Sequence, residues 1–111
     1  MPPKGAYTFV LHSHLPYVIN HGRWPHGMDW LNEATAETYI PLLNVFNKLV
    51  NEGISPKVTI GITPVLTEQL NDNSFKEEFK EYVKTKIKAA VEDERLFTSW
   101  NQLRLARQAK L

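Results

Sequence analysis

The sequence contains no cysteine, which excludes a disulfide framework and any chemistry that depends on a thiolate. It also lacks an excess of either charge, since 13 Lys and Arg residues and 12 Asp and Glu residues leave a net charge of +1. That balance supplies no strong field for phosphate backbones or anionic lipid surfaces, so we expect no nucleic-acid partner and no membrane partner. The N-terminus lacks the apolar stretch of a secretory signal or a membrane span, so we expect a cytoplasmic protein.

Histidine is absent after residue 26. The four histidines fall early in the chain, at His12, His14, His21 and His26. They follow the apolar run from Ala6 to Leu11, which predicts a short strand covered on both faces. The stretch from there to about Trp30 contains prolines and glycines and no period of 2 or 3.6 residues, so it predicts a long irregular loop. Loops of such length are usually functional or disordered, and the His, Trp and Tyr content argues against disorder.

The middle of the chain predicts helices and a second strand. A helix is expected from Trp30 to about Thr38. Pro41 then either interrupts this helix or starts a second one at its first turn, where a missing N–H costs little. Gly53 is placed to close that helix as a left-handed cap. The alternating apolar segment from Val58 to Ile62 predicts the second strand.

Two capping signals follow the second strand. Thr63 is expected to cap a helix with Pro64 at its first position, and Ser74 with Glu77 forms a capping-box pattern before a long helix with a solvated Lys and Glu face. The order strand, loop, helix, strand, helix, helix is the beginning of a parallel α/β sheet. Two strands cannot form a sheet that is buried on both faces, so we expect the chain to be truncated relative to a complete domain.

His12 and His14 are expected at the carboxyl end of the first strand, where open α/β sheets and barrels place ligand sites. Alternation along a strand would direct both side chains to the same face. Three interpretations are open: ligands of a metal ion, hydrogen-bond donors to a polar substrate, or histidines satisfied by backbone groups. A catalytic zinc ion generally takes three protein ligands. Only His21, His26 and loop carboxylates such as Asp29 are near in the sequence to complete such a set.

The composition of the loop favours a sugar ligand. Trp24, Trp30 and Tyr17 supply flat apolar faces on which pyranose rings can stack. The hydroxyl groups of such a ligand would find polar partners in His12, His14, His26, Arg23 and Asn20. The alternative for either tryptophan is a core anchor beneath the loop.

The stretches "VLHSHLPYV" and "NHGRWPHGMDWLNEATAETYIPLL" resemble the N-terminal part of glycoside hydrolase family 57, most closely its α-1,4-glucan branching enzyme subgroup. The family's first motif has a His-x-His-Gln-Pro form, which is met here by His12, His14 and Pro16 with Leu15 in place of the glutamine. That departure fits the branching enzymes better than the amylases and the 4-α-glucanotransferases. The later stretch "VTIGITPVLTEQL" resembles the second strand of the family.

The resemblance implies an α/β fold in which residues 1–111 form the N-terminal segment of an incomplete (β/α)7 TIM-like barrel, a partial catalytic domain. It also implies a retaining enzyme that acts on α-glucan without a metal or another cofactor, through a Glu nucleophile and an Asp general acid/base. Those two carboxylates belong to later motifs, so we assign no catalytic residue in this chain, and none to Asp29, Glu33 or Glu37. The chain alone is therefore expected to be inactive.

The resemblance further implies that His12 and His14 line the subsite of the sugar ring that is attacked. We expect Trp24, His26 and Trp30 to complete the substrate-binding set. Two other hypotheses remain open: a carbohydrate-binding or structural chain without turnover, and a zinc-dependent hydrolase.

Overall fold

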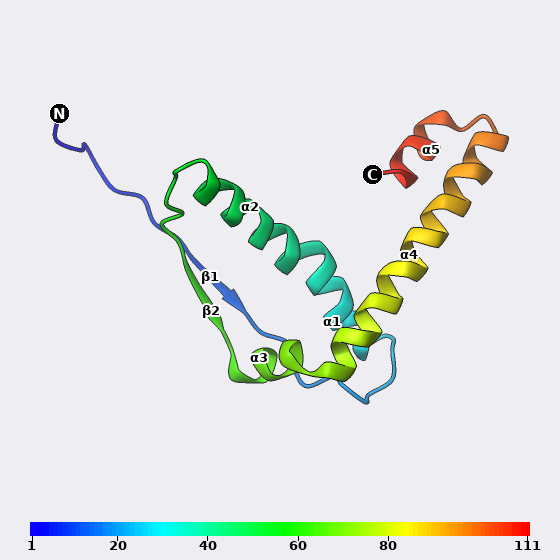
Figure 1. The fold of residues 1–111 in the computed structure, drawn as a ribbon, viewed down its shortest axis with the longest axis horizontal. Helices are drawn as coiled ribbons and strands as arrows, with labels where there is room; N and C mark the ends of the chain where they lie inside the picture. Colours follow the sequence, from blue (N-terminus) through cyan, green and yellow to red (C-terminus); the bar gives the residue numbers. More distant parts are fainter. The chain divides into compact units, whose positions relative to one another are not determined.

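The computed structural model describes all 111 residues, which form two compact units, residues 1–75 and residues 76–111. The first unit holds both strands (Figure 1). Its elements are β1 (Val10–Ser13), α1 (Met28–Ala34), the π-helical segment η1 (Thr35–Tyr39), α2 (Ile40–Asn51), β2 (Thr59–Ile62) and α3 (Pro64–Asn71). Helix α4 (Asn73–Ser99) begins in the first unit and continues through the second, which also contains α5 (Leu103–Ala109).

Strands β1 and β2 pair in parallel, with Val10 opposite Thr59 and Ser13 opposite Ile62. Parallel strands cannot be joined by a tight turn. The chain accordingly passes from β1 to β2 through the loop, α1, η1 and α2, and α2 lies beside the strands (Figure 1). The predicted mixed α/β fold with two short parallel strands is confirmed.

The first strand lies further along the chain than predicted. The apolar run suggested Ala6 to Leu11, whereas β1 comprises Val10–Ser13 and includes His12. The length of β1 is set by its pairing with β2, since all four of its residues have a partner there. The prediction that the strand is covered on both faces is wrong for this chain. Val10 is 69% exposed because the helices that line the sheet lie on its other face.

Helical structure begins at Met28, slightly earlier than predicted, and continues to Asn51 through α1, η1 and α2. Of the two alternatives for Pro41, the structure has the second, since Pro41 lies in the first turn of α2. Proline has no N–H to donate, and its ring conflicts with the carbonyl four residues back. In the π-helical segment directly before it, the Ile40 N–H bonds to the Thr35 carbonyl, which shifts the helical register at this point.

Gly53 ends α2 as predicted. Its φ is +76°, a left-handed value that favours glycine. The Gly53 N–H donates to the Val50 carbonyl at 3.0 Å, and the Ile54 N–H donates to the Leu49 carbonyl at 2.9 Å. This is the hydrogen-bond pattern of a Schellman motif, and it satisfies two carbonyls that the helix end leaves open.

The predicted capping box at Ser74 and Glu77 is wrong. Helix α4 begins at Asn73, and its cap is Asp72, whose Oδ1 accepts the backbone N–H groups of Ser74 at 2.8 Å and Phe75 at 3.1 Å. The Ser74 hydroxyl donates to the same carboxylate. The Asp72 carboxylate makes charge-assisted hydrogen bonds to these N–H groups at the start of the helix.

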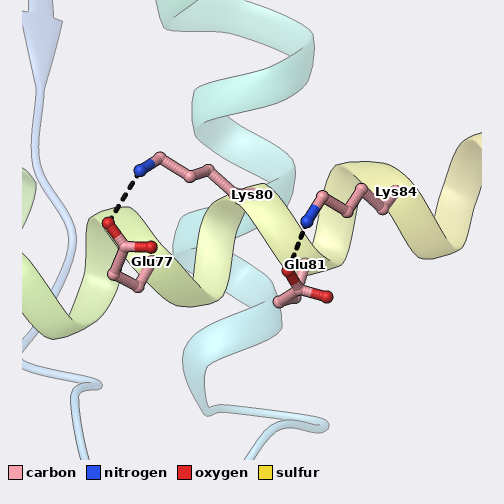
Figure 2. Close-up of polar contacts among 4 residues, drawn as sticks. All are labelled: Glu77, Lys80, Glu81 and Lys84. Carbon is pink, nitrogen blue, oxygen red and sulfur yellow. Dashed lines mark hydrogen bonds and ion pairs between the residues drawn. The ribbon is translucent and has the colours of Figure 1, made fainter.

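The charged side of α4 carries two ion pairs at a spacing of three residues (Figure 2). Lys80 Nζ lies 2.7 Å from Glu77 Oε1, and Lys84 Nζ lies 2.7 Å from Glu81 Oε1. The hydrogen bond and the charge of Lys80 hold the pKa of the Glu77 carboxyl below its ordinary value, and Glu81 raises the pKa of Lys84 in the same way. All four side chains are well exposed, which confirms the predicted solvated face, and such pairs contribute little to stability. None of the helices has the length and apolar character that a membrane crossing requires.

The loop after β1 supplies much of the buried interior of the first unit. Leu15, Val18 and Ile19 are at most 4% exposed. Side chains of the helices are equally buried: Met28 and Leu31 of α1 and Leu66 of α3. The predicted long irregular loop is confirmed, since no strand or helix lies between β1 and α1. The buried side chains hold the first residues of this loop in place.

Candidate functional site

His12 and His14 lie at the carboxyl end of β1, as predicted, His12 within the strand and His14 just beyond it. Both are exposed, whereas the neighbouring Leu11 and Ser13 are half-buried. Because successive side chains of a strand point to opposite faces, the two histidines lie on one side of the sheet and Leu11 and Ser13 on the other.

The ring of His12 lies next to Gly61 of β2, its partner in the parallel register. A β-carbon at Gly61 would lie 3.4 Å from His12 Nδ1, an ordinary van der Waals distance. The His12 ring therefore lies beside the backbone of β2 at Gly61. The sequence pattern gave no sign of this neighbour.

The other side of the sheet faces helix α2 and is apolar. A cavity of about 170 Å³ lies there. Its lining comes from both strands and the helices: Ser13, Tyr39, Leu42, Leu43, Phe46, Ile60, Ile62, Leu66 and Leu70. Burial raises the pKa of the Tyr39 phenol. Since this space is lined almost wholly by carbon, it offers few partners for a hydroxyl-rich ligand, and the polar site lies on the histidine side.

Thr63 connects the second strand to His14. It caps α3 as predicted, with its Oγ1 accepting the Leu66 N–H at 3.4 Å. The same Oγ1 lies 2.9 Å from His14 Nδ1. The Thr63 N–H also donates to the Ser13 carbonyl at 3.2 Å, which extends the parallel ladder by one bond. One ring nitrogen of His14 is thus engaged, and Nε2 is the nitrogen left for a ligand.

The loop folds back onto the start of α1. The Met28 N–H donates to the Gly22 carbonyl at 2.8 Å, and the Asp29 N–H donates to the Arg23 carbonyl at 3.1 Å. These carbonyls satisfy backbone donors that a helix N-terminus leaves open. Gly27 is buried in the closure, where a β-carbon would lie 2.2 Å from the Gly22 oxygen. The loop therefore has a defined shape that depends on its own backbone.

The aromatic side chains of the loop are exposed to different degrees. Trp24 is 73% exposed, Tyr17 56% and Trp30 39%, so Trp24 is not a core anchor within this chain. The ring centroids of His26 and Trp30 lie 5.6 Å apart, and those of Tyr17 and His21 lie 5.8 Å apart. The loop thus presents flat apolar surfaces with imidazoles beside them, the mixture that was expected for a sugar ligand.

The acidic side chains near the site have other partners or stand on helices. Asp29 Oδ1 lies 3.4 Å from Arg23 Nε and 3.4 Å from Asn32 Nδ2. Glu33 lies on α1 and Glu37 on η1. No three side chains of the His, Asp and Glu type come together in a way that could hold a metal ion, so the zinc hypothesis has no ligand set within this chain.

The structure therefore brings His12 and His14 together on one side of the sheet, and His26 and Trp30 together in the loop. No hydrogen bond or ring contact joins these two groups, or joins Trp24 to either. Sequence reasoning missed Gly61 beside His12, the contact of Thr63 with His14, and the buried Gln69 of α3. For Gln69 a signal was present, because its spacing from Leu66 and Leu70 places it on the apolar side of the helix.

The model of glycosyl hydrolase family 57 matches residues 8–107 of the chain. The chain belongs to this family. The match includes both strands, the loop and every helix up to the first part of α5, so the resemblance noted from the two histidines and the loop is confirmed.

The relatives of this family 57 chain are branching enzymes by name. It is 52% identical over 90 residues to a 1,4-alpha-glucan branching enzyme of Thermococcus kodakarensis. The aligned residues make up 81% of this chain and 13% of that protein. A probable 1,4-alpha-glucan branching enzyme of Mycobacterium tuberculosis is 46% identical over 71 residues, 64% of this chain and 14% of that protein. The crystal structure of a GH57-type branching enzyme from Pyrococcus horikoshii is similar with a TM-score of 0.79 at 43% identity, over 92% of this chain and 21% of that one. The chain spans only a small part of each relative.

Proposed function

We propose that this family 57 chain forms one side of the glucan-binding cleft of a 1,4-α-glucan branching enzyme, which transfers α-1,4-linked glucan segments into α-1,6 branches. The observation that carries the proposal is the position of His12 and His14, side by side on the uncovered face of the sheet at the end of β1. The identity of 52% to a relative with that name supports the choice of reaction.

The arrangement of the first unit supports its place in an incomplete (β/α)7 barrel. In a β/α barrel the helices cover the outer side of the strands, and ligands bind at the carboxyl ends of the strands. Here the apolar cavity and α2 mark the outer side of β1 and β2. The opposite side, which carries His12, would then face the interior of the barrel, and His14 would stand at its rim.

The chemistry of these side chains suits a neutral ligand rich in hydroxyl groups. Imidazole nitrogens donate hydrogen bonds to hydroxyl oxygens or accept them, and the exposed faces of Trp24 and Trp30 offer stacking surfaces. The role of this chain is to bind and orient the glucan. A retaining reaction needs two carboxyl groups about 5–5.5 Å apart, and these are supplied by other parts of the protein. A place in cytoplasmic glycogen synthesis is part of the same proposal.

The substitution Trp24→Ala should weaken the binding of maltoheptaose to the chain while leaving its stability nearly unchanged. Stacked aromatic contacts contribute about 0.5–1.5 kcal/mol beyond the area they bury, which corresponds to roughly a two- to tenfold loss of affinity. Because Trp24 is 73% exposed, its removal leaves no cavity in the core. Affinity is measured by NMR titration, and stability by urea unfolding.

The matched control is Trp100→Ala, which removes an indole that is 60% exposed at the end of α4. This variant should bind maltoheptaose as the unchanged chain does. If Trp24→Ala lowers the unfolding midpoint while the affinity stays level, Trp24 does not belong to the glucan site.

A further inference from the structure

Helix α3 holds the segment that follows β1 through a buried glutamine. Gln69 is 1% exposed and makes three hydrogen bonds. Its Oε1 accepts the Val18 N–H at 2.8 Å, and its Nε2 donates to the Pro16 carbonyl at 3.0 Å and to the Val65 carbonyl at 3.3 Å. Donors and acceptors on both sides of the amide are matched, so only one orientation of the side chain satisfies them. Gln69 thus hydrogen-bonds both a backbone N–H and a backbone carbonyl of the loop.

Thr63 holds the same segment at the other end of the helix. Its Oγ1 lies 2.9 Å from His14 Nδ1, so the contacts of α3 with this segment begin at His14 and end at Val18. The partners are separated by 49 and 51 residues along the chain. Contacts of that kind restrict the loop more strongly than its local sequence does, because each one closes a long stretch of chain.

We propose that Thr63 and Gln69 are positioning residues for His14, which fix the segment His14–Val18 on α3 so that the Nε2 of the His14 ring is presented to the glucan. This inference rests on the proposed function for its ligand, but the positioning itself is measured without any ligand. Neither residue touches the sugar in this account. Their contribution is to remove alternative orientations of the imidazole before the glucan binds.

The proposed positioning includes one tautomer of His14. A threonine hydroxyl has one hydrogen to donate and two lone pairs. Its oxygen accepts the Leu66 N–H at the helix cap with one lone pair, so toward His14 Nδ1 it can either donate its hydrogen or accept with the second lone pair. In the proposed positioning it takes the first direction, in which the hydroxyl donates to Nδ1 and the ring proton of the neutral imidazole resides on Nε2. A donor is thereby presented to a sugar hydroxyl.

The nitrogen resonances of the imidazole test this assignment. In the ¹⁵N-labelled chain, at a pH where His14 is neutral, Nδ1 should resonate as an unprotonated ring nitrogen and Nε2 as a protonated one. Thr63→Val removes the hydroxyl at nearly constant shape, and both frequencies should move toward the average of two exchanging tautomers. Thr63→Ser, which keeps the hydroxyl, should restore the original pair.

Thr67→Val is the matched control, since Thr67 is exposed on the same helix and its hydroxyl donates to the Thr63 carbonyl at 3.1 Å. It should leave the His14 resonances unchanged. A protonated Nδ1 in the unchanged chain overturns the assignment of the tautomer without the need for any variant. Unchanged His14 frequencies in folded Thr63→Val overturn the role of Thr63.

Gln69→Leu tests the second contact by leaving the Val18 N–H without its acceptor. Hydrogen exchange at the Val18 amide should become at least about tenfold faster, as the loss of a buried hydrogen bond predicts, whereas Gln108→Leu on exposed α5 should not change it. Should Gln69→Leu fail to fold, the unchanged chain is still informative. A coupling across the hydrogen bond from the Val18 nitrogen to the Gln69 side-chain carbonyl carbon is expected, and its absence contradicts the contact.

Maltoheptaose titrations separate this inference from the proposed function. The proposed function and the positioning role both hold if His14→Ala and Thr63→Val each weaken maltoheptaose binding by about three- to tenfold, the scale of a lost hydrogen bond. The control Thr67→Val should not weaken it. If the unchanged chain shows the expected tautomer but binds no maltoheptaose, the proposed function is contradicted and the positioning of His14 stands. If His14→Ala weakens binding and Thr63→Val does not, the positioning role is overturned and the proposed function stands.

Discussion

The 111-residue chain by itself is expected to form no α-1,6 branches in amylose and to release no reducing ends from it. Among the acidic residues near the histidines in the sequence, Asp29 is paired with Arg23, Glu33 lies on α1 and Glu37 on η1. None of them forms a hydrogen bond or an ion pair with His12 or His14. Removing members of a catalytic unit costs about 10⁴- to 10⁶-fold in kcat, which places the expected rate below detection.

A chimera supplies the positive counterpart of this prediction. The 90-residue segment of this chain that aligns with the Thermococcus kodakarensis branching enzyme at 52% identity can replace its counterpart there. The chimera should form branches, and His14→Ala within it should lower the rate. Branch content is measured as the chain-length distribution after debranching of the product. A purified 111-residue chain that raises the branch content would mean that Asp29, Glu33 and Glu37 have been wrongly excluded as catalytic residues.

Gly27→Ala is expected to lower the free energy of unfolding by about 3 kcal/mol, at the upper end of the cost of overpacking a closed site. The new β-carbon would lie 2.2 Å from the Gly22 oxygen and 2.8 Å from the Arg23 carbonyl carbon, both of which are backbone atoms. The Gly22 carbonyl also accepts the Met28 N–H, so the loop cannot move aside without losing a hydrogen bond at the start of α1. The free energy is measured by urea unfolding.

Gly5→Ala is the control for this variant, because no atom lies within 4 Å of a β-carbon built at Gly5, and the residue is exposed. Its effect should stay within about 0.5 kcal/mol, as for most surface substitutions. If Gly27→Ala unfolds at the same urea concentration as Gly5→Ala, the close contact between Gly27 and Gly22 does not exist in solution. The loop would then lack the defined shape that this contact gives it.

Local signals predicted those elements whose causes are local. The left-handed cap at Gly53, the cap at Thr63 and the alternation that gives β2 each depend on a few neighbouring residues, and all three are found. Bounds that depend on a distant partner were predicted less well. The first strand was placed too early because its length depends on pairing with β2, which no local pattern contains.

A competing local signal explains the error at the start of α4. Ser74 and Glu77 have the spacing of a capping box, yet Asp72 precedes them with a carboxylate that accepts two backbone N–H groups. Either side chain is a common cap. The choice between them depends on where α3 ends, and α3 ends at Asn71, which leaves Asp72 in the extended conformation that a cap requires.

The candidate site was predictable only in part, because some of its contacts depend on residues that are distant in the chain. His12 and His14 are two residues apart, so the strand alternation alone places them on one face. The contacts that hold them join residues far apart in the chain, Thr63 to His14 and Gln69 to Val18. A polar residue at an apolar helical position, as Gln69 is, indicates a buried hydrogen bond, but the sequence does not say to which backbone groups.

A titration of the ¹⁵N-labelled chain with maltoheptaose, followed through its tryptophan indole N–H resonances, tests the central claim most directly. Trp24 and Trp30 belong to the candidate site, whereas Trp100 lies at the end of α4 in the second unit and serves as an internal reference. The account predicts that the Trp24 and Trp30 resonances shift with a common dissociation constant while that of Trp100 does not. Shifts confined to Trp100, or none at millimolar maltoheptaose, would contradict it.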